Sequence, residues 1–322
     1  MTDLAEHRAG ASDTPLTAET VAGIHSAIVT PLRADLSVDE AALADQVARM
    51  MAVPGMRGVM CNGHAGENAL TSRADKARIV AVCREAMAGR GVLIAGVNAE
   101  ASHAAARQAE DAAGAGAEAI MVFGPNGFAL GQDTRMALTH HRIIGAATGL
   151  PMLLFQGAVG AGAYAYTPDV LRALLDLPQV IAIKEGSWDS AAYEATRRLA
   201  KAQRPEVAVM ASGDEHLWSC FIFGSEGSIV SLAALVPEPI VALDRAVRDS
   251  DTAAARAAHE VIYPLARAIY GRKPGNLATA RLKTCMMLAG LLPDDRVYPP
   301  YGPLDEDERN TLSAAMRAAG VL

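Results

Sequence analysis

Short apolar runs recur along the chain and alternate with longer segments that have the three-to-four-residue periodicity of amphipathic helices. Eight runs have strand length, and nearly all are apolar at every position rather than at alternate positions. The runs are Ile24–Val29, Gly58–Cys61, Val92–Ala95, Ala119–Val122, Met152–Phe155, Val180–Ile183, Val207–Ala211 and Ser228–Leu232. Because a parallel sheet is covered by helices on both faces, this pattern predicts an α/β fold with parallel strands.

Helix start signals lie between these runs. Ser37 is followed by Glu40 and Ser72 by Asp75, which is the spacing of a capping box. Thr167 precedes Pro168, a combination typical of a helix cap and first turn. Three of the helices are therefore predicted to begin just after Ser37, Ser72 and Thr167.

Eight strand–helix units fill the segment from about residue 22 to 248, as a closed barrel requires. We therefore predict a (β/α)8 TIM barrel over 23–248. The alternative is an open doubly wound sheet, but no Gly-x-Gly-x-x-Gly follows the first strand, where a dinucleotide site needs it. Ala-rich helical segments with Gly and Pro breaks over 249–322 predict a C-terminal three-helix appendage. The polar residues 1–22 predict a flexible extension without the apolar core of a signal peptide.

Composition narrows the classes of partner. The 322 residues are 51% apolar and carry a net charge of -7, so no nucleic-acid partner is expected. No apolar run reaches 18 residues, so no membrane segment is expected. The four cysteines are far apart and form no Cys-x-x-Cys pair, which indicates a reduced, cytoplasmic setting. Neither a metal site nor a cofactor is expected, because no paired histidines with a nearby carboxylate mark one.

A lysine breaks the apolar pattern where a barrel would carry its chemistry. Lys184 ends the sixth apolar run and precedes Glu185-Gly186-Ser187. The C-terminal ends of barrel strands hold the functional groups, and burial there lowers the pKa of a lysine. The neutral amine can attack a carbonyl to form an imine, so Lys184 is a candidate nucleophile. The alternative is a lysine that extends from the strand end to pair with Glu185, Glu226 or another carboxylate.

Two further segments are candidates for substrate binding. A glycine-rich turn at 63–67 follows the second strand, and its backbone N–H groups can hold a carboxylate. Such turns also serve chain reversal alone. The loop after the fifth strand predicts a substrate pocket, with the candidate residues Phe155, Gln156, Tyr164 and Tyr166. Trp188 and Trp218 are interpreted as packing residues.

Several short motifs occur in a characteristic order. They are Ala27–Leu32, Gly63-x-x-Gly66-Glu67, Ile183–Ser187, Ser212-Gly213-Asp214, Gly224-x-x-Gly227-x-Ile229 and Tyr298-Pro299-Pro300. With them the chain resembles the dihydrodipicolinate synthase / N-acetylneuraminate lyase family from about Gly23 to the C-terminus. That resemblance implies a class I lyase, usually tetrameric, in which Lys184 forms a Schiff base with pyruvate or another 2-oxo acid. It also implies that Ala65, Gly66, Ser212 and Ile229 lie beside the substrate.

The chain departs from the family pattern at several positions, among them those that bind the substrate carboxylate and relay protons. Where the family has two hydroxyl residues, His64 and Ala65 stand, and Phe155 replaces the proton-relay tyrosine. The aromatic pair after the fourth strand and the arginine of the fifth-strand loop are also missing; Pro125–Phe128 and Val159–Ala161 stand there. His64 is therefore the leading acid–base candidate, and its protonated form would also attract a carboxylate. Its alternative role is that of a turn histidine that hydrogen-bonds a neighbouring loop.

Other side chains offer partial substitutes for the missing groups. Tyr164 and Tyr166 are alternative proton donors, and Gln156 is expected to orient a substrate oxygen. Together these observations predict an aldolase- or dehydratase-type lyase that acts on a 2-oxo acid and does not catalyse authentic dihydrodipicolinate synthesis. The alternative is a ligand-binding or regulatory paralogue of the same barrel. We expect a homotetramer or dimer.

Overall fold

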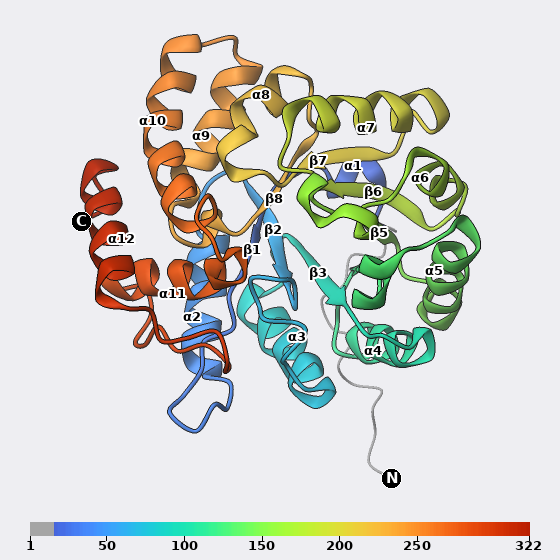
Figure 1. Cartoon of the computed structure of the whole chain (residues 1–322), viewed down its shortest axis with the longest axis horizontal. Coiled ribbons are helices and arrows are strands. Elements are labelled where there is room, and N and C mark those ends of the chain that lie inside the picture. The colour runs from blue at the N-terminus through green and yellow to red at the C-terminus, as the bar shows by residue number, and fades with distance from the viewer. Residues whose placement is uncertain (1–15) are drawn as a thin grey trace.

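The computed structural model describes residues 16–322 and contains a closed barrel of eight parallel strands in the order β1 to β8 (Figure 1). Every predicted run overlaps a strand. The strands are β1 (Gly23–Ala27), β2 (Met56–Cys61), β3 (Val92–Val97), β4 (Ala119–Val122), β5 (Met152–Gln156), β6 (Val180–Glu185), β7 (Ala208–Ala211) and β8 (Gly227–Val230). The predicted barrel is confirmed, and the doubly wound alternative is wrong because β8 pairs with β1.

Eight α-helices follow the strands and cover the barrel (Figure 1). They are α2 (Glu40–Met51), α3 (Arg73–Met87), α4 (Ser102–Gly114), α5 (Thr134–Thr148), α6 (Pro168–Leu175), α7 (Ser190–Gln203), α8 (Leu217–Ile222) and α9 (Pro237–Arg248). Five short 3₁₀ segments lie at loops and helix ends: η1 (Asn126–Leu130), η2 (Val159–Tyr164), η3 (Asp214–His216), η4 (Leu232–Ala234) and η5 (Gly275–Leu277).

The predicted helix caps are correct in two of three places. The Ser72 and Thr167 side chains accept backbone N–H groups at the starts of α3 and α6. The cap predicted at Ser37 is wrong, because Asp39 caps α2 by accepting the amide of Ala42. The hydroxyl of Ser37 instead donates to Asp35 at 2.6 Å.

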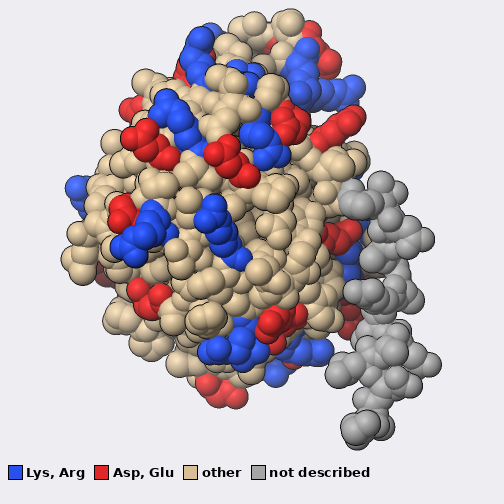
Figure 2. Space-filling view, turned by 90° about the vertical axis from the view of Figure 1, so that its right-hand side faces the viewer, with Lys and Arg blue, Asp and Glu red and all other residues tan. Residues whose placement is uncertain are grey.

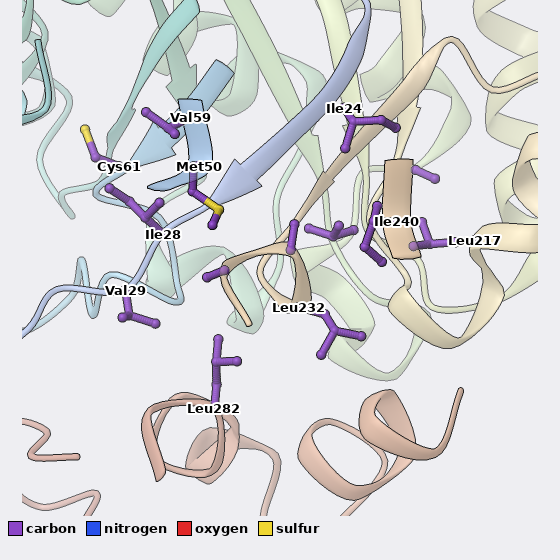
Figure 3. Close-up of a cluster of buried hydrophobic side chains, with 14 of the residues drawn as sticks. Ile24, Ile28, Val29, Met50, Val59, Cys61, Leu217, Leu232, Ile240 and Leu282 are labelled. Atoms are coloured by element: carbon purple, nitrogen blue, oxygen red, sulfur yellow. The ribbon is translucent and has the colours of Figure 1, made fainter. Parts of the chain in front are cut away.

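Alternating side chains of each strand enter two separate cores. One core lies between strands and helices; Figure 3 shows part of it, including Ile24, Val59 and Leu232. The other core fills the barrel interior and includes Met60, Ala182 and Ile229. Because side chains two positions apart share a face, residue 184 on β6 points into the interior like Ala182.

A short helix closes the N-terminal end of the barrel. Helix α1 (Ala18–Val21) packs below β6 and β7, and its Val21 joins the interior core. The Val21 carbonyl oxygen lies 2.7 Å from Nε2 of the buried His25. The predicted flexible extension is therefore wrong for 18–21, whereas residues 1–15 lie outside the described residues.

The C-terminal segment forms the three predicted helices, α10 (Thr252–Ile269), α11 (Ala278–Leu288) and α12 (Glu306–Ala318). Helix α10 packs on α9 and α12, and α11 packs on α10 and α12 (Figure 1). The fully buried guanidinium of Arg281 donates two hydrogen bonds to Glu308, both at 3.0 Å, and so ties α11 to α12.

Within residues 16–322, no helix is long and apolar enough to cross a membrane. On the face shown in Figure 2, basic and acidic side chains are interspersed.

Candidate active site

A cavity of about 160 Å³ opens where the strands end. Most of its lining residues come from the C-terminal ends of barrel strands or the turns after them, and four come from the C-terminal helical segment. The lining residues are Ala27, His64, Ala65, Phe155, Lys184, Trp188, Ser212, Asp214, Ser231, Tyr270, Ala278, Thr279 and Leu282. This is the end of a (β/α)8 barrel at which catalytic groups are found.

Lys184 lies at this cavity with its side chain turned into the barrel. The residue is 9% exposed, and its Nζ lies 5.8 Å from the centre of the Phe155 ring. Burial lowers the pKa of Lys184 to about 8, although the nearby carboxyl group of Asp214 opposes this change. At pH 7 a pKa of about 8 leaves roughly a tenth of the amine neutral, against about one part in 3,000 for an ordinary lysine.

The predicted alternative role for Lys184 is wrong. Glu185 accepts hydrogen bonds from Ser187 and Thr196, and Glu226 pairs with Lys201 at 2.5 Å. Lys184 makes no ion pair with any residue of the described chain, 16–322. Its amine therefore faces the cavity without a fixed partner.

The turn after β2 presents unused backbone donors. Inside it, the amide of Glu67 donates to the carbonyl of His64 at 3.0 Å, and that of Asn68 donates to Gly63 at 3.2 Å. The amides of His64, Ala65 and Gly66 donate to no residue between 16 and 322. His64 and Ala65 line the cavity and Gly66 follows them without lining it, so the amides of this turn are candidate donors to a carboxylate there.

Buried contacts fix the position of that turn. Glu67 has a φ of 55°, and its carboxylate accepts the Tyr298 amide at 2.8 Å. The other carboxylate oxygen lies 2.5 Å from Nζ of Lys283 on α11. On the barrel side, the hydroxyl of Thr30 donates to the Gly66 carbonyl at 3.0 Å. The free amides are therefore held from both the barrel and the C-terminal helices.

His64 lies over an aromatic floor. Its ring centre is 4.6 Å from that of Phe123 and 5.1 Å from that of Phe155. His64 is an exposed residue that lines the cavity, and its ring packs against these two phenylalanines. Desolvation beside them, and then the Lys184 charge, lowers the pKa of His64 to about 4. This direction favours the neutral imidazole at neutral pH, so the expectation that a protonated His64 attracts the carboxylate is not supported.

The ring of His64 also has no role in holding the turn. Its ring nitrogens hydrogen-bond none of the residues in the range 16–322, whereas its backbone carbonyl accepts the Glu67 amide at 3.0 Å and the Thr279 hydroxyl at 3.4 Å. The alternative of a structural turn histidine is therefore not supported. A neutral imidazole at this place can accept a proton from a bound ligand.

Five residues predicted to bind substrate do not line the cavity: Gly66, Gln156, Tyr164, Tyr166 and Ile229. Gln156 donates to the carbonyl of Tyr166 at 3.0 Å and accepts its amide at 2.9 Å. The Tyr164 hydroxyl donates to Gly124 at 3.0 Å, and the Tyr166 hydroxyl lies 3.4 Å from His141. Gln156 follows the inward-pointing Phe155 on β5, so its side chain points out of the barrel.

The two strand-end predictions on β7 and β8 differ in outcome. Ser212 lines the cavity, as expected from the resemblance. Ile229 is fully buried in the interior core, two residues before Ser231, and so lies one layer below the cavity floor. Its role there is packing.

Eight cavity residues are not among the predicted site residues, and Trp188, Asp214, Ser231 and Tyr270 are four of them. The Tyr270 hydroxyl lies 2.7 Å from Oγ of Ser231, and its ring centre is 5.4 Å from that of Trp188. Trp188 therefore packs against Tyr270, as interpreted, and also lines the cavity. Burial raises the pKa of Asp214 to about 7, while the backbone amide of Leu232 and the charge of Lys184 act in the opposite direction.

Part of this set could be found by sequence reasoning. Ser231 lies two positions after the inward-facing Ile229, and Asp214 belongs to the Ser212-Gly213-Asp214 motif. Tyr270 carried no such signal, because it follows α10, outside the barrel. Within 16–322 no group of three His, Cys, Asp or Glu side chains is arranged to hold a metal ion.

The fold and site define a (β/α)8 enzyme with a buried lysine at the strand ends, and comparisons with known proteins identify its family. The model of the dihydrodipicolinate synthetase family matches residues 20–319. The chain belongs to this family, which is a family of lyases.

Its relatives are distant in sequence but match over nearly their whole length. A 4-hydroxy-tetrahydrodipicolinate synthase of Parasynechococcus marenigrum is 30% identical over 295 residues, covering 91% of this chain and 93% of the relative. An uncharacterized DapA-like lyase of Halobacterium salinarum is 29% identical, and the match covers 93% of this chain and 94% of the relative. Among solved structures, YagE of E. coli K12, in complex with pyruvate, superposes with a TM-score of 0.86 at 21% identity. The match covers 94% of this chain and 99% of YagE, and it shows a shared fold.

Proposed function

We propose that the protein is a Schiff-base-forming lyase that acts on pyruvate or another 2-oxo acid through Lys184. The observation that carries the proposal is the Lys184 amine itself. It is buried, has a pKa of about 8 and faces a cavity that also exposes unused amide donors. A neutral amine beside a carboxylate-binding turn is what imine formation with a 2-oxo acid requires.

In this proposal the carboxylate of the 2-oxo acid binds the amides of His64, Ala65 and Gly66. This places the neighbouring keto carbon within reach of the Lys184 nitrogen, which attacks it. The imine then accepts the electron pair that is released when a bond to the carbon next to the imine carbon breaks. Such a bond breaks in an aldol cleavage or a dehydration. The neutral imidazole of His64 takes up the proton that this bond cleavage frees.

The cavity wall limits the rest of the substrate. Among the lining residues, all in the described range, Lys184 is the sole cation, and Phe155, Trp188 and Leu282 contribute apolar surface. We propose an adduct with an uncharged distal part, either an aryl or alkyl pyruvate derivative or a sugar-acid derivative. Authentic dihydrodipicolinate synthesis is not proposed, because the tyrosine and hydroxyl pair used there are replaced by Phe155, His64 and Ala65.

Borohydride trapping tests the proposal. The protein is incubated with pyruvate, 2-oxobutyrate or keto-deoxy sugar acids, reduced and digested with trypsin. A reduced imine at Lys184 blocks cleavage there, so the ligand mass is expected on a peptide spanning 173–197. Lys76 is an internal control, because burial also lowers its pKa to about 8, yet it lies outside the cavity. Adducts on both lysines would indicate general amine reactivity and contradict the proposal.

A ligand-binding or regulatory paralogue is the second candidate. The observation that favours it is Phe155, which leaves the Lys184 side of β5 without a proton-transferring hydroxyl. If no member of the oxo-acid panel gives an adduct, whereas calorimetry detects its binding, this second function replaces the first.

We also propose that the chain assembles as a dimer or tetramer. Apolar side chains are exposed beside the barrel mouth on η1, α5 and η2, with exposed fractions of 97% for Leu130, 44% for Met136 and 59% for Val159. Monomeric proteins rarely leave such apolar surface uncovered. A second copy of the chain is the proposed cover.

A further inference from the structure

Imine formation needs a proton path that β5 does not provide. When a neutral amine condenses with a ketone, both of its protons must move from nitrogen to the oxygen that departs as water. Phe155 has no exchangeable proton, and the Tyr164 and Tyr166 hydroxyls are engaged outside the cavity. We infer that the hydroxyls of Tyr270 and Ser231 form this proton relay, an inference that rests on the proposed function of Lys184.

The geometry places the two hydroxyls together at the cavity. Their oxygens lie 2.7 Å apart, so one donates a hydrogen bond to the other. Ser231 follows β8 on the inward-facing side of the barrel, whereas Tyr270 caps the C-terminal end of α10. The ring of Trp188 packs against that of Tyr270 at 5.4 Å. The pair is therefore a fixed structural feature that joins the barrel to the helical segment.

The chemistry of the pair suits a relay. In the first transfer, the amine attacks the keto carbon, the carbonyl π bond breaks, and one proton passes from nitrogen to oxygen, giving the carbinolamine. In the second, the remaining proton passes to the hydroxyl, the C–O bond breaks, water leaves and the C=N bond forms. In each transfer the hydroxyl pair accepts one proton and gives one, so it is unchanged at the end.

The electrostatics favour a relay over a free phenolate. Burial and the nearby Asp214 carboxyl raise the pKa of Tyr270 well above its usual value, so the phenol stays protonated. A group that gives and takes protons in one concerted step does not need to ionise.

The test measures how fast the imine forms. Wild type, Tyr270→Phe, Ser231→Ala and the double variant are mixed with the 2-oxo acid that wild type traps best, beginning with pyruvate. Each sample is quenched with borohydride at successive times, and the adduct on Lys184 is quantified by mass spectrometry. We expect Tyr270→Phe to slow imine formation by about 100-fold or more, the usual contribution of a general acid or base. Because the pair acts as a unit, the double variant should be little slower than Tyr270→Phe.

Two further variants separate proton transfer from packing. Tyr166→Phe is the matched control and should form the imine within about twofold of the wild-type rate, because its hydroxyl lies outside the cavity. Adding Phe155→Tyr to Tyr270→Phe places a phenol on the other side of Lys184 and should restore at least part of the rate. A defect caused by lost packing against Trp188 would not respond to that second substitution.

The outcomes are distinguishable. If wild type forms the imine and Tyr270→Phe forms it equally fast, the relay is refuted while the proposed function stands. Failure of Phe155→Tyr to restore any rate also counts against the relay. If wild type forms no imine with any oxo acid, the proposed function and the relay fall together.

Discussion

The buried ion pair beneath the carboxylate-binding turn provides the most quantitative prediction. The side chains of Lys283 and Glu67 are 0% and 4% exposed, and Nζ lies 2.5 Å from a carboxylate oxygen. Lys283 also donates to the carbonyl of Arg296 at 2.8 Å. Lys283→Met keeps most of the side-chain volume but leaves the Glu67 carboxylate buried, with the Tyr298 amide as its remaining donor.

Removing one partner of a buried pair costs about 3–5 kcal/mol, because the other charge loses its compensation. At roughly 2 °C per kcal/mol for a large domain, Tm should fall by about 6–10 °C. Adding Glu67→Gln to Lys283→Met removes the stranded charge, so the double variant should be more stable than Lys283→Met alone. Arg78→Met is the control, because it breaks an ion pair of 2.6 Å with Glu40 at the exposed surface, where such pairs contribute little.

Thermal unfolding followed by circular dichroism measures the effect. The same Lys283→Met variant should bind the 2-oxo acid more weakly, which raises KM more than it lowers kcat, since the amides of the turn lose their support. A Tm equal to that of Arg78→Met would refute the reasoning. So would a fully additive double-mutant cycle, because it would mean that Lys283 and Glu67 do not interact.

Three further predictions concern the site and the assembly. The rate of imine formation should rise about tenfold per pH unit and level off near pH 8, since the neutral Lys184 amine reacts and its pKa is about 8; a midpoint at pH 10 would contradict this. Asp214→Asn should move that midpoint to lower pH, because the Asp214 charge raises the pKa of Lys184. The neighbouring substitution Glu215→Gln should leave the midpoint unchanged. An upward shift in Asp214→Asn would contradict the assigned effect of Asp214 on Lys184. Light scattering should give a multiple of the 33.5 kDa chain mass at micromolar concentration, and the monomer mass would rule out the proposed assembly.

The barrel could be predicted because its strands are apolar on both faces, which leaves few alternatives to a parallel sheet covered by helices. Helix starts were less certain where two residues compete for one role. Ser37 has the spacing of a capping box with Glu40, but Asp39 directly precedes the helix, and its carboxylate accepts the Ala42 amide at 3.2 Å. Spacing in the sequence does not decide between two adjacent residues that can both cap.

The site could be predicted only as far as it depends on strand ends. Lys184 was found because it interrupts an apolar run where a barrel has its active site. Gln156 was misassigned because a step of one residue on a strand reverses the face that a side chain occupies. Tyr270 was missed because its position depends on how α10 packs against η4 and α9, which no local pattern specifies.

The strand order explains why proton transfer is proposed on one side of Lys184. The lysine on β6 separates the aromatic rings of Phe123 and Phe155, after β4 and on β5, from the polar groups that follow β7 and β8. The aromatic side favours the neutral amine by excluding water, and it has no proton to give. A ketone held by the turn after β2 must therefore exchange protons toward β8, where Ser231 and Tyr270 lie. In this proposal the hydroxyls of Ser231 and Tyr270 take the role that a hydroxyl on β5 would have, where Phe155 stands.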